Sequence, residues 1–149
     1  MKENHYRHLG IMTALSLLAM YALMYAMVNT SGDVVMNINQ VYMAGLMVAP
    51  MLVIELVVMR AMYHNATLNA ALLTGAVVVG VALFLFIRQQ TAVGDRQFLR
   101  SMIPHHSGAL LMCREASLQD EEIVALCREI TESQQREIDQ MNGILKRLP

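Results

Sequence analysis

The stretch AALLTGAVVVGVALFLFI, residues 70–87, contains no charged side chain. A helix rises about 1.5 Å per residue, so a run of this length approaches the roughly 30 Å of a bilayer's hydrocarbon core. Two more apolar runs precede it: residues 9–28 carry no charge, and residues 41–59 carry only Glu55. The sequence therefore predicts three transmembrane helices, at 9–28, 41–59 and 70–87.

The composition divides the chain into two parts. Of the 149 residues, 56% are hydrophobic and 15% are charged, whereas charge is nearer a quarter in soluble domains. Most of the Lys, Arg, Asp and Glu residues lie between Arg88 and the C-terminus. We therefore expect a membrane region at 1–88 and a polar domain at 89–149. The net charge of −1 gives no indication of a nucleic-acid partner.

Basic residues predict the orientation. Lys2 and Arg7 precede the first run, the first loop has no basic residue, and the second loop has Arg60. The positive-inside rule then places the N-terminus in the cytoplasm and the C-terminal domain in the periplasm of a bacterial inner membrane. Three arginines close to the third run argue for the opposite orientation: Arg88, Arg96 and Arg100. The first run is too long for the apolar region of a secretory signal, so we expect an uncleaved anchor.

Two features of the apolar runs allow two interpretations each. Glu55 either takes part in an ion or proton relay, or lies near the end of its span and reaches toward Arg60. Methionines form stripes on two of the predicted helices, at Met12, Met20, Met24 and Met27 and at Met43, Met47, Met51 and Met59. Thioethers bind Cu(I), but methionine is also a flexible filler of helix interfaces. Packing is the favoured interpretation of the stripes.

Helical spacing predicts an antiparallel hairpin in the polar domain. Its first helix follows an N-cap at Asp95, and its second runs from a cap at Asp120 to about Leu145. Positions equidistant from the turn lie level, which places Cys113 opposite Cys127. The two cysteines therefore form a disulfide, remain as inert core residues, or bind a metal.

The only adjacent histidines, His105 and His106, lie on the first of these helices. One broad face of this helix carries Met102, His106 and Cys113 and, slightly rotated, His105 and Met112. The second helix places further donors opposite this face, at Ser133, Gln134, Glu137 and Met141. Imidazole, thioether and carboxylate together suit a borderline-to-soft metal. Alternatively, the histidines are polar residues near the membrane.

The string FLRSMIPHHSGALLMCREA, residues 98–116, followed by Gln134-Gln135-x-Glu137-Ile138-x-x-Met141, resembles the domain of unknown function 305 family. The resemblance covers residues 95–145. It implies a ferritin-like helical bundle, export, and copper binding through methionine and histidine. The ligands it implies are Met102, His105, His106, Met112 and Met141, with Gln134 and Glu137 as their hydrogen-bonding partners.

The sequence departs from that family in two respects. Cys113 and Cys127 occupy positions where the family has small residues, and the chain has one hairpin where many relatives have two. About 50 residues cannot bury a core alone. We therefore expect a homodimer in which two hairpins complete a four-helix bundle.

These observations predict an all-α, membrane-anchored protein that binds Cu(I) for copper storage, delivery or tolerance. The alternative is a structural or interaction protein whose histidines and methionines only pack a bundle. We expect no enzyme, since the chain lacks Glu-x-x-His, Cys-x-x-Cys and phosphate-loop motifs. Transport through the spans is a minor variant that would require oligomerisation.

Overall fold

The computed structural model describes residues 4–149, which form helices joined by turns and contain no strand. The elements are α1 (Asn4–Leu23), the short 3-10 helix η1 (Ser31–Asp33), α2 (Ile38–Val58), α3 (Ala66–Gln89), α4 (Asp95–Glu115) and α5 (Glu121–Arg147). The prediction of an all-helical protein is confirmed for this range. The described chain forms two compact units: residues 4–24 with 39–91, and residues 25–38 with 92–149.

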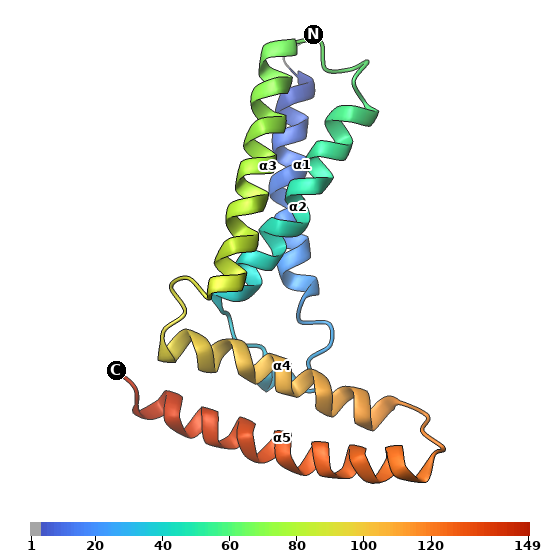
Figure 1. The fold of residues 1–149 in the computed structure, drawn as a ribbon, viewed down its shortest axis with the longest axis vertical. Coiled ribbons are helices and arrows are strands. Elements are labelled where there is room, and N and C mark those ends of the chain that lie inside the picture. The colour runs from blue at the N-terminus through green and yellow to red at the C-terminus, as the bar shows by residue number, and fades with distance from the viewer. Residues whose placement is uncertain (1–3) are drawn as a thin grey trace. The chain divides into compact units, whose positions relative to one another are not determined.

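In the first unit α1, α2 and α3 lie side by side (Figure 1). Small residues let α2 and α3 approach closely, because a Cβ atom added at Gly45 would lie 2.7 Å from Cδ1 of Leu83. A Cβ added at Gly80 would lie 3.2 Å from the Cβ of Ala49. Close backbone approach through small residues is typical of helices that pack in lipid.

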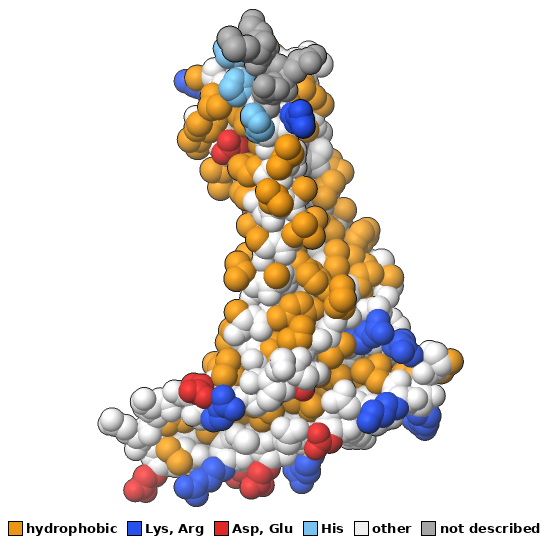
Figure 2. All heavy atoms as spheres, turned by 180° about the vertical axis from the view of Figure 1, so that it is seen from behind, with side chains coloured by type: hydrophobic (Ala, Val, Ile, Leu, Met, Phe, Trp, Pro, Cys, Tyr) orange, Lys and Arg blue, Asp and Glu red, His pale blue; other side chains and the backbone are white. Residues whose placement is uncertain are grey.

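Two of the three predicted spans correspond to helices that are long and apolar enough to cross a membrane, α2 and α3. Their hydrophobic side chains are largely exposed: Ala76 is the only buried residue of α3, and Val78 on the same helix is 61% exposed. Figure 2 shows hydrophobic side chains over the visible face of this unit. Helices that are both apolar and exposed are unlike the buried core helix of a soluble protein.

The first predicted span, residues 9–28, is not supported. Helix α1 ends at Leu23 and begins at Asn4, so its length includes a polar first turn with His5, Arg7 and His8. The chain turns at residues 24–27 and enters the second unit, where the hydroxyl of Tyr25 donates a hydrogen bond to the carbonyl of Val35. The apolar run therefore exceeds the helix because its last residues pack elsewhere.

Near the end of α2, Glu55 accepts a hydrogen bond of 3.2 Å from the hydroxyl of Tyr63. The predicted reach toward Arg60 is therefore wrong. The ring of Tyr63 packs 5.3 Å from that of Tyr6, whose hydroxyl donates to Asn69. Burial, and then the charge of Glu55, raise the pKa of Tyr63 above its ordinary value. Glu55 is thus held by a polar network at one end of the unit.

The methionine stripe of α2 is partly exposed. Met43, Met47 and Met59 are 37%, 47% and 38% exposed, and Met51 is of intermediate burial. On α1, Met12 packs against a buried cluster that contains Leu9. Packing is therefore confirmed for Met12, whereas the α2 stripe keeps part of its surface uncovered within the described residues.

In the second unit α4 and α5 form an antiparallel hairpin (Figure 1). The carboxylate of Asp120 caps α5 by accepting from the amide of Ile123, as predicted. The N-cap of α4 is Gly94, so the predicted cap at Asp95 is wrong by one residue. The hairpin encloses a buried apolar cluster of Leu99, Ile103, Leu110, Ile138 and Met141.

Residues 25–38, which we call the connector, belong to the hairpin unit although they lie between α1 and α2. Val35 packs against the hairpin core. The buried hydroxyl of Ser107 donates to Asp33 and accepts from the amide of Asn29, at 2.6 Å and 2.8 Å. The predicted division at residue 88 therefore omits a segment that folds with the hairpin. Part of the missing core comes from this chain rather than from a second copy.

Candidate functional site

Four donor side chains lie on the facing sides of α4 and α5. Met102 and His106 are separated by four residues on α4, and Glu137 and Met141 by four residues on α5. Side chains four residues apart share one face of a helix. The antiparallel hairpin turns both faces toward each other, and we call these four residues the donor cluster.

His106 is the most constrained member of the donor cluster, since its side chain is only 10% exposed. Its Nδ1 atom lies 3.1 Å from Oε2 of Glu137. Among the described residues Nδ1 makes this ion-pair contact and no hydrogen bond. A buried ring nitrogen that makes no hydrogen bond is rare and requires an explanation, such as a bound water or ion.

Electrostatics keep this imidazole neutral. Burial lowers the pKa of His106 below its ordinary value of 6.5, and the neighbouring His105 lowers it further, while the Glu137 carboxylate opposes both effects. The hydroxyl of Ser133 donates to the other carboxylate oxygen of Glu137 at 2.9 Å. A neutral imidazole retains the lone pair that binds a metal.

The thioethers lie in the apolar part of the same helix interface. Met141 is 8% exposed and belongs to the hairpin core. Met102 is half-buried and packs against that core. The hairpin therefore brings one imidazole and one carboxylate into contact, and each has a thioether one helical turn away on the same side of its helix.

The other residues named by the sequence are not part of this cluster. His105 is exposed, and its ring lies 5.9 Å from that of His106, tilted by 59°. Met112 is 59% exposed. Gln134 is half-buried on α5. Adjacent helical residues diverge by about 100°, which is why one histidine faces α5 and the other faces outward.

Sequence reasoning missed the connector side of the site. Asn29, Asp33 and Ser107 form a buried polar contact directly beside His106 in the chain. The side-chain oxygen of Asn29 is buried and has no partner among the described residues. The signal available in the sequence was the pair of small residues Ser107-Gly108. A Cβ atom added at Gly108 would lie 3.5 Å from the carbonyl oxygen of Met27, so glycine leaves room for the connector beside α4.

The donor set determines which metals fit. No group of three or more His, Cys, Asp or Glu within residues 4–149 is arranged to hold a metal ion. The arrangement present has one imidazole, one carboxylate and two thioethers, and thioethers favour soft ions such as Cu(I). The residues therefore fit a soft ion better than Zn²⁺ or Fe²⁺.

Two helical turns beyond His106 on α4, Cys113 forms a disulfide with Cys127 of α5. The Cα atoms of the two cysteines are 5.4 Å apart. The described chain has no free cysteine. The disulfide ties the two helices together close to the α4–α5 turn, so the facing donors of the hairpin are held in register from one end.

Comparisons with known proteins agree with the motif. Residues 85–145 match the family described as Domain of unknown function (DUF305). The chain is also 34% identical over 119 residues to "Uncharacterized protein L153" of Acanthamoeba polyphaga mimivirus, an alignment that covers 78% of this chain and 76% of that protein. This alignment is longer than the family match, so it includes residues outside 85–145. No solved structure matches the chain.

Proposed function

We propose that this chain, which belongs to the DUF305 family, is a membrane-anchored protein that binds Cu(I) at the donor cluster Met102, His106, Glu137 and Met141. Its roles would be copper storage, delivery or tolerance. The observation that carries the proposal is His106, a buried neutral imidazole whose Nδ1 has no hydrogen-bond partner among the described residues.

Each residue of the cluster has a distinct role. His106 and the two thioethers would hold the ion, which supplies soft-ligand affinity when bound. Glu137, fixed by Ser133, would bind the ion or balance its charge. Met141 and Met102 line the apolar side and exclude water, which protects a cuprous ion from ligand exchange.

The membrane part of the proposal is supported by the exposed apolar surfaces of α2 and α3. We further propose that the apolar part of α1 crosses the bilayer with them. The 20 residues of α1 supply about 30 Å of length at 1.5 Å per residue. Three crossings would put the N-terminus and the hairpin on opposite sides of the membrane, and Lys2 and Arg7 favour the cytoplasm for the N-terminus. The hairpin would then lie outside the cytoplasm, where a disulfide is stable.

The hairpin leaves an apolar surface that neither α5 nor the connector covers. On α4, residues 98, 105, 109 and 112 recur at spacings of seven, four and three, so they lie on one side of the helix, which we call the seam. Phe98 and Met112 of this seam are 51% and 59% exposed, and Leu126 of α5 is 53% exposed. We propose that a second copy of the hairpin packs here, which would bring His105 and Met112 of the two chains together.

Competition titration tests the copper site. Full-length protein in detergent is titrated with Cu(I) against bicinchoninate under anaerobic conditions. We expect His106→Ala to weaken Cu(I) binding by at least about tenfold, or about 1.4 kcal/mol, because it removes the only buried imidazole. Met141→Leu keeps the volume of the side chain and removes the sulfur, and is expected to act in the same direction.

His105→Ala is the matched control, since it removes an exposed imidazole from the adjacent position. We expect less than about a threefold effect when His105→Ala is compared with its parent in the monomeric Phe98→Lys and Met112→Lys background, where no second chain contacts His105. Wild-type protein that does not bind Cu(I), or unchanged affinity in both His106→Ala and Met141→Leu, would reject the site and favour a structural role for these residues. Far-ultraviolet circular dichroism checks that each variant keeps its helices.

The mass of the detergent-solubilised complex tests the dimer. We expect a dimeric mass and cross-linking through the hairpin for the wild type. The double change Phe98→Lys and Met112→Lys is expected to give monomers, because it places charges in the seam. Glu129→Lys, on the exposed charged side of α5, is the control. A monomeric wild type without hairpin cross-links would contradict the proposal.

A further inference from the structure

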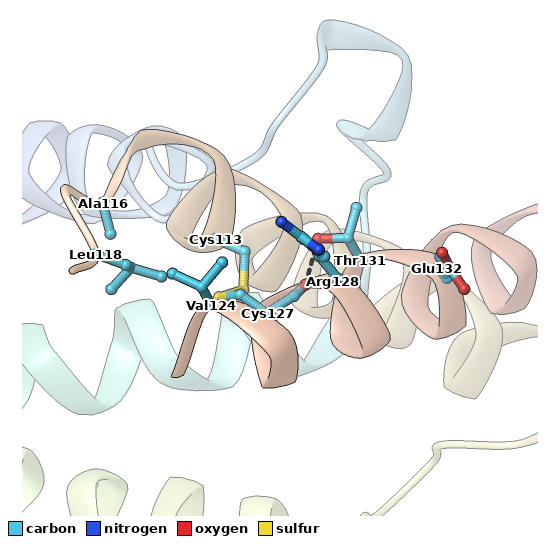
Figure 3. A pocket seen from close by; sticks show the side chains of 8 residues that line it. All are labelled: Cys113, Ala116, Leu118, Val124, Cys127, Arg128, Thr131 and Glu132. Carbon is cyan, nitrogen blue, oxygen red and sulfur yellow. Dashed lines mark hydrogen bonds between the residues drawn. A yellow bond between two sulfur atoms is a disulfide. The ribbon is translucent and has the colours of Figure 1, made fainter. Parts of the chain in front are cut away.

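The Cys113–Cys127 disulfide is not enclosed by protein. Both cysteines line an open pocket of about 390 Å³ beside the α4–α5 turn. Its apolar wall comes from Ala116, Leu118 and Val124. Figure 3 shows the sulfur–sulfur bond among these side chains. Buried structural disulfides are inert because no thiol reaches them, whereas this one faces a space large enough for a small molecule.

The polar wall of the pocket contains one cation. Arg128 directly follows Cys127 in the chain and lines the same pocket, next to the disulfide. Glu132, whose carboxylate opposes an anion, lines the pocket one helical turn further along α5, next to Thr131. The hydroxyl of Thr131 donates to the carbonyl of Cys127, so it is occupied within the helix. A guanidinium near a sulfur stabilises the thiolate form of that sulfur and the anionic groups of an approaching molecule.

We propose that this pocket is a thiol–disulfide exchange site for an anionic low-molecular-weight thiol. The incoming thiolate forms a bond to Sγ of Cys113. The bond between Cys113 and Cys127 breaks, and its electron pair remains on Sγ of Cys127 as a thiolate beside Arg128. A second thiol molecule then attacks the mixed disulfide, which releases the small disulfide and leaves two cysteine thiols. Two thiols are oxidised and one protein disulfide is reduced.

Through this site, the redox state of the compartment would control whether α4 and α5 are covalently joined beside their turn. The two cysteines are 14 positions apart and lie on either side of the whole turn, so reduction of the disulfide releases the end of the interface between α4 and α5. This inference does not depend on copper, because the exchange reaction uses no metal. Failure of one proposal therefore leaves the other in place.

The test measures reduction of the folded, full-length, metal-free protein by glutathione. Samples are quenched with N-ethylmaleimide, and intact mass gives the fractions of disulfide, glutathione adduct and dithiol. We expect reduction in native buffer within about tenfold of the rate in 6 M guanidinium, and an adduct on Cys113 in peptide maps. A native rate more than a thousandfold slower would overturn the proposal, and an adduct confined to Cys127 would overturn the assignment of the leaving group.

A charge comparison tests Arg128. Arg128→Gln is expected to slow reaction with glutathione about threefold to tenfold, and to slow reaction with neutral 2-mercaptoethanol less. Arg136→Gln removes an exposed arginine of the same helix outside the pocket, and both rates should remain at the wild-type value. Equal effects of the two variants on glutathione would contradict selection for an anionic thiol.

Discussion

At the scale of single residues, His106 links burial to pH. Its pKa lies below the ordinary value because the interface disfavours the imidazolium. The unfolded chain therefore binds more protons than the folded chain as pH falls through about 6.5, and the folded state loses stability there. We expect the unfolding temperature of metal-free protein to fall between pH 7.5 and 5, and His106→Gln to reduce this dependence. Thermal unfolding in the presence of a copper chelator measures it.

The slope of the unfolding temperature against pH is compared between the wild type and His106→Gln. This comparison isolates the contribution of His106, since the other titratable groups are the same in both proteins. His105→Gln serves as the control because that ring is exposed, and it should leave the pH dependence unchanged. An identical slope in wild type and His106→Gln would show that burial of His106 does not contribute to the pH response.

Ser107 holds the connector to α4. Its hydroxyl is fully buried and satisfies both the Asp33 carboxylate and the amide of Asn29. Ser107→Ala leaves both groups without this partner, at a cost of about 1–3 kcal/mol. We expect faster amide hydrogen exchange in residues 29–35, measured by mass spectrometry. Ser117→Ala, in the exposed turn, is the control, and protection that stays equal in both variants would contradict the role given to Ser107.

At the scale of elements, the sequence predicts those features of the hairpin that depend only on the geometry of its helices and turn. The cap at Asp120 and the level positions of Cys113 and Cys127 follow from helix geometry alone. Helical spacing also placed His106 on the face of Met102 and Cys113 with His105 rotated from it, but only the structure shows that this rotation leaves His106 buried and His105 exposed. Met112 lies on the exposed side for the same reason, two turns beyond His105.

The elements that the sequence misplaced are those whose ends depend on contacts far along the chain. Hydropathy continues through residue 28, but α1 stops at Leu23 because Tyr25 and the following residues pack on the hairpin. No local signal marks this exit. Helix α3 likewise ends on Gln90 in the left-handed conformation, with φ 51°, where a glycine would have been the recognisable signal. Tertiary packing therefore decided the end of α1, and a left-handed residue other than glycine ended α3.

At the scale of the whole molecule, the connector constrains the topology. It precedes α2, and the hairpin follows α3, yet both belong to one compact unit joined by the contact of Asp33 with Ser107. A chain that crosses a bilayer in α2 and returns in α3 satisfies this constraint, because it leaves both segments on the same side. An odd number of crossings between them would require that unit to be divided by the membrane.

Labelling of introduced cysteines tests this topology. The native cysteines form a disulfide, so an introduced cysteine is the only free thiol. Ser31→Cys in the connector, Ser117→Cys in the turn and His64→Cys between α2 and α3 are all at exposed positions. In intact cells a membrane-impermeant maleimide should label the first two and not the third, because the proposed orientation has the hairpin outside the cytoplasm. Labelling of the third alone would reverse the orientation but keep the two crossings, whereas different outcomes for Ser31→Cys and Ser117→Cys would exclude the two crossings themselves.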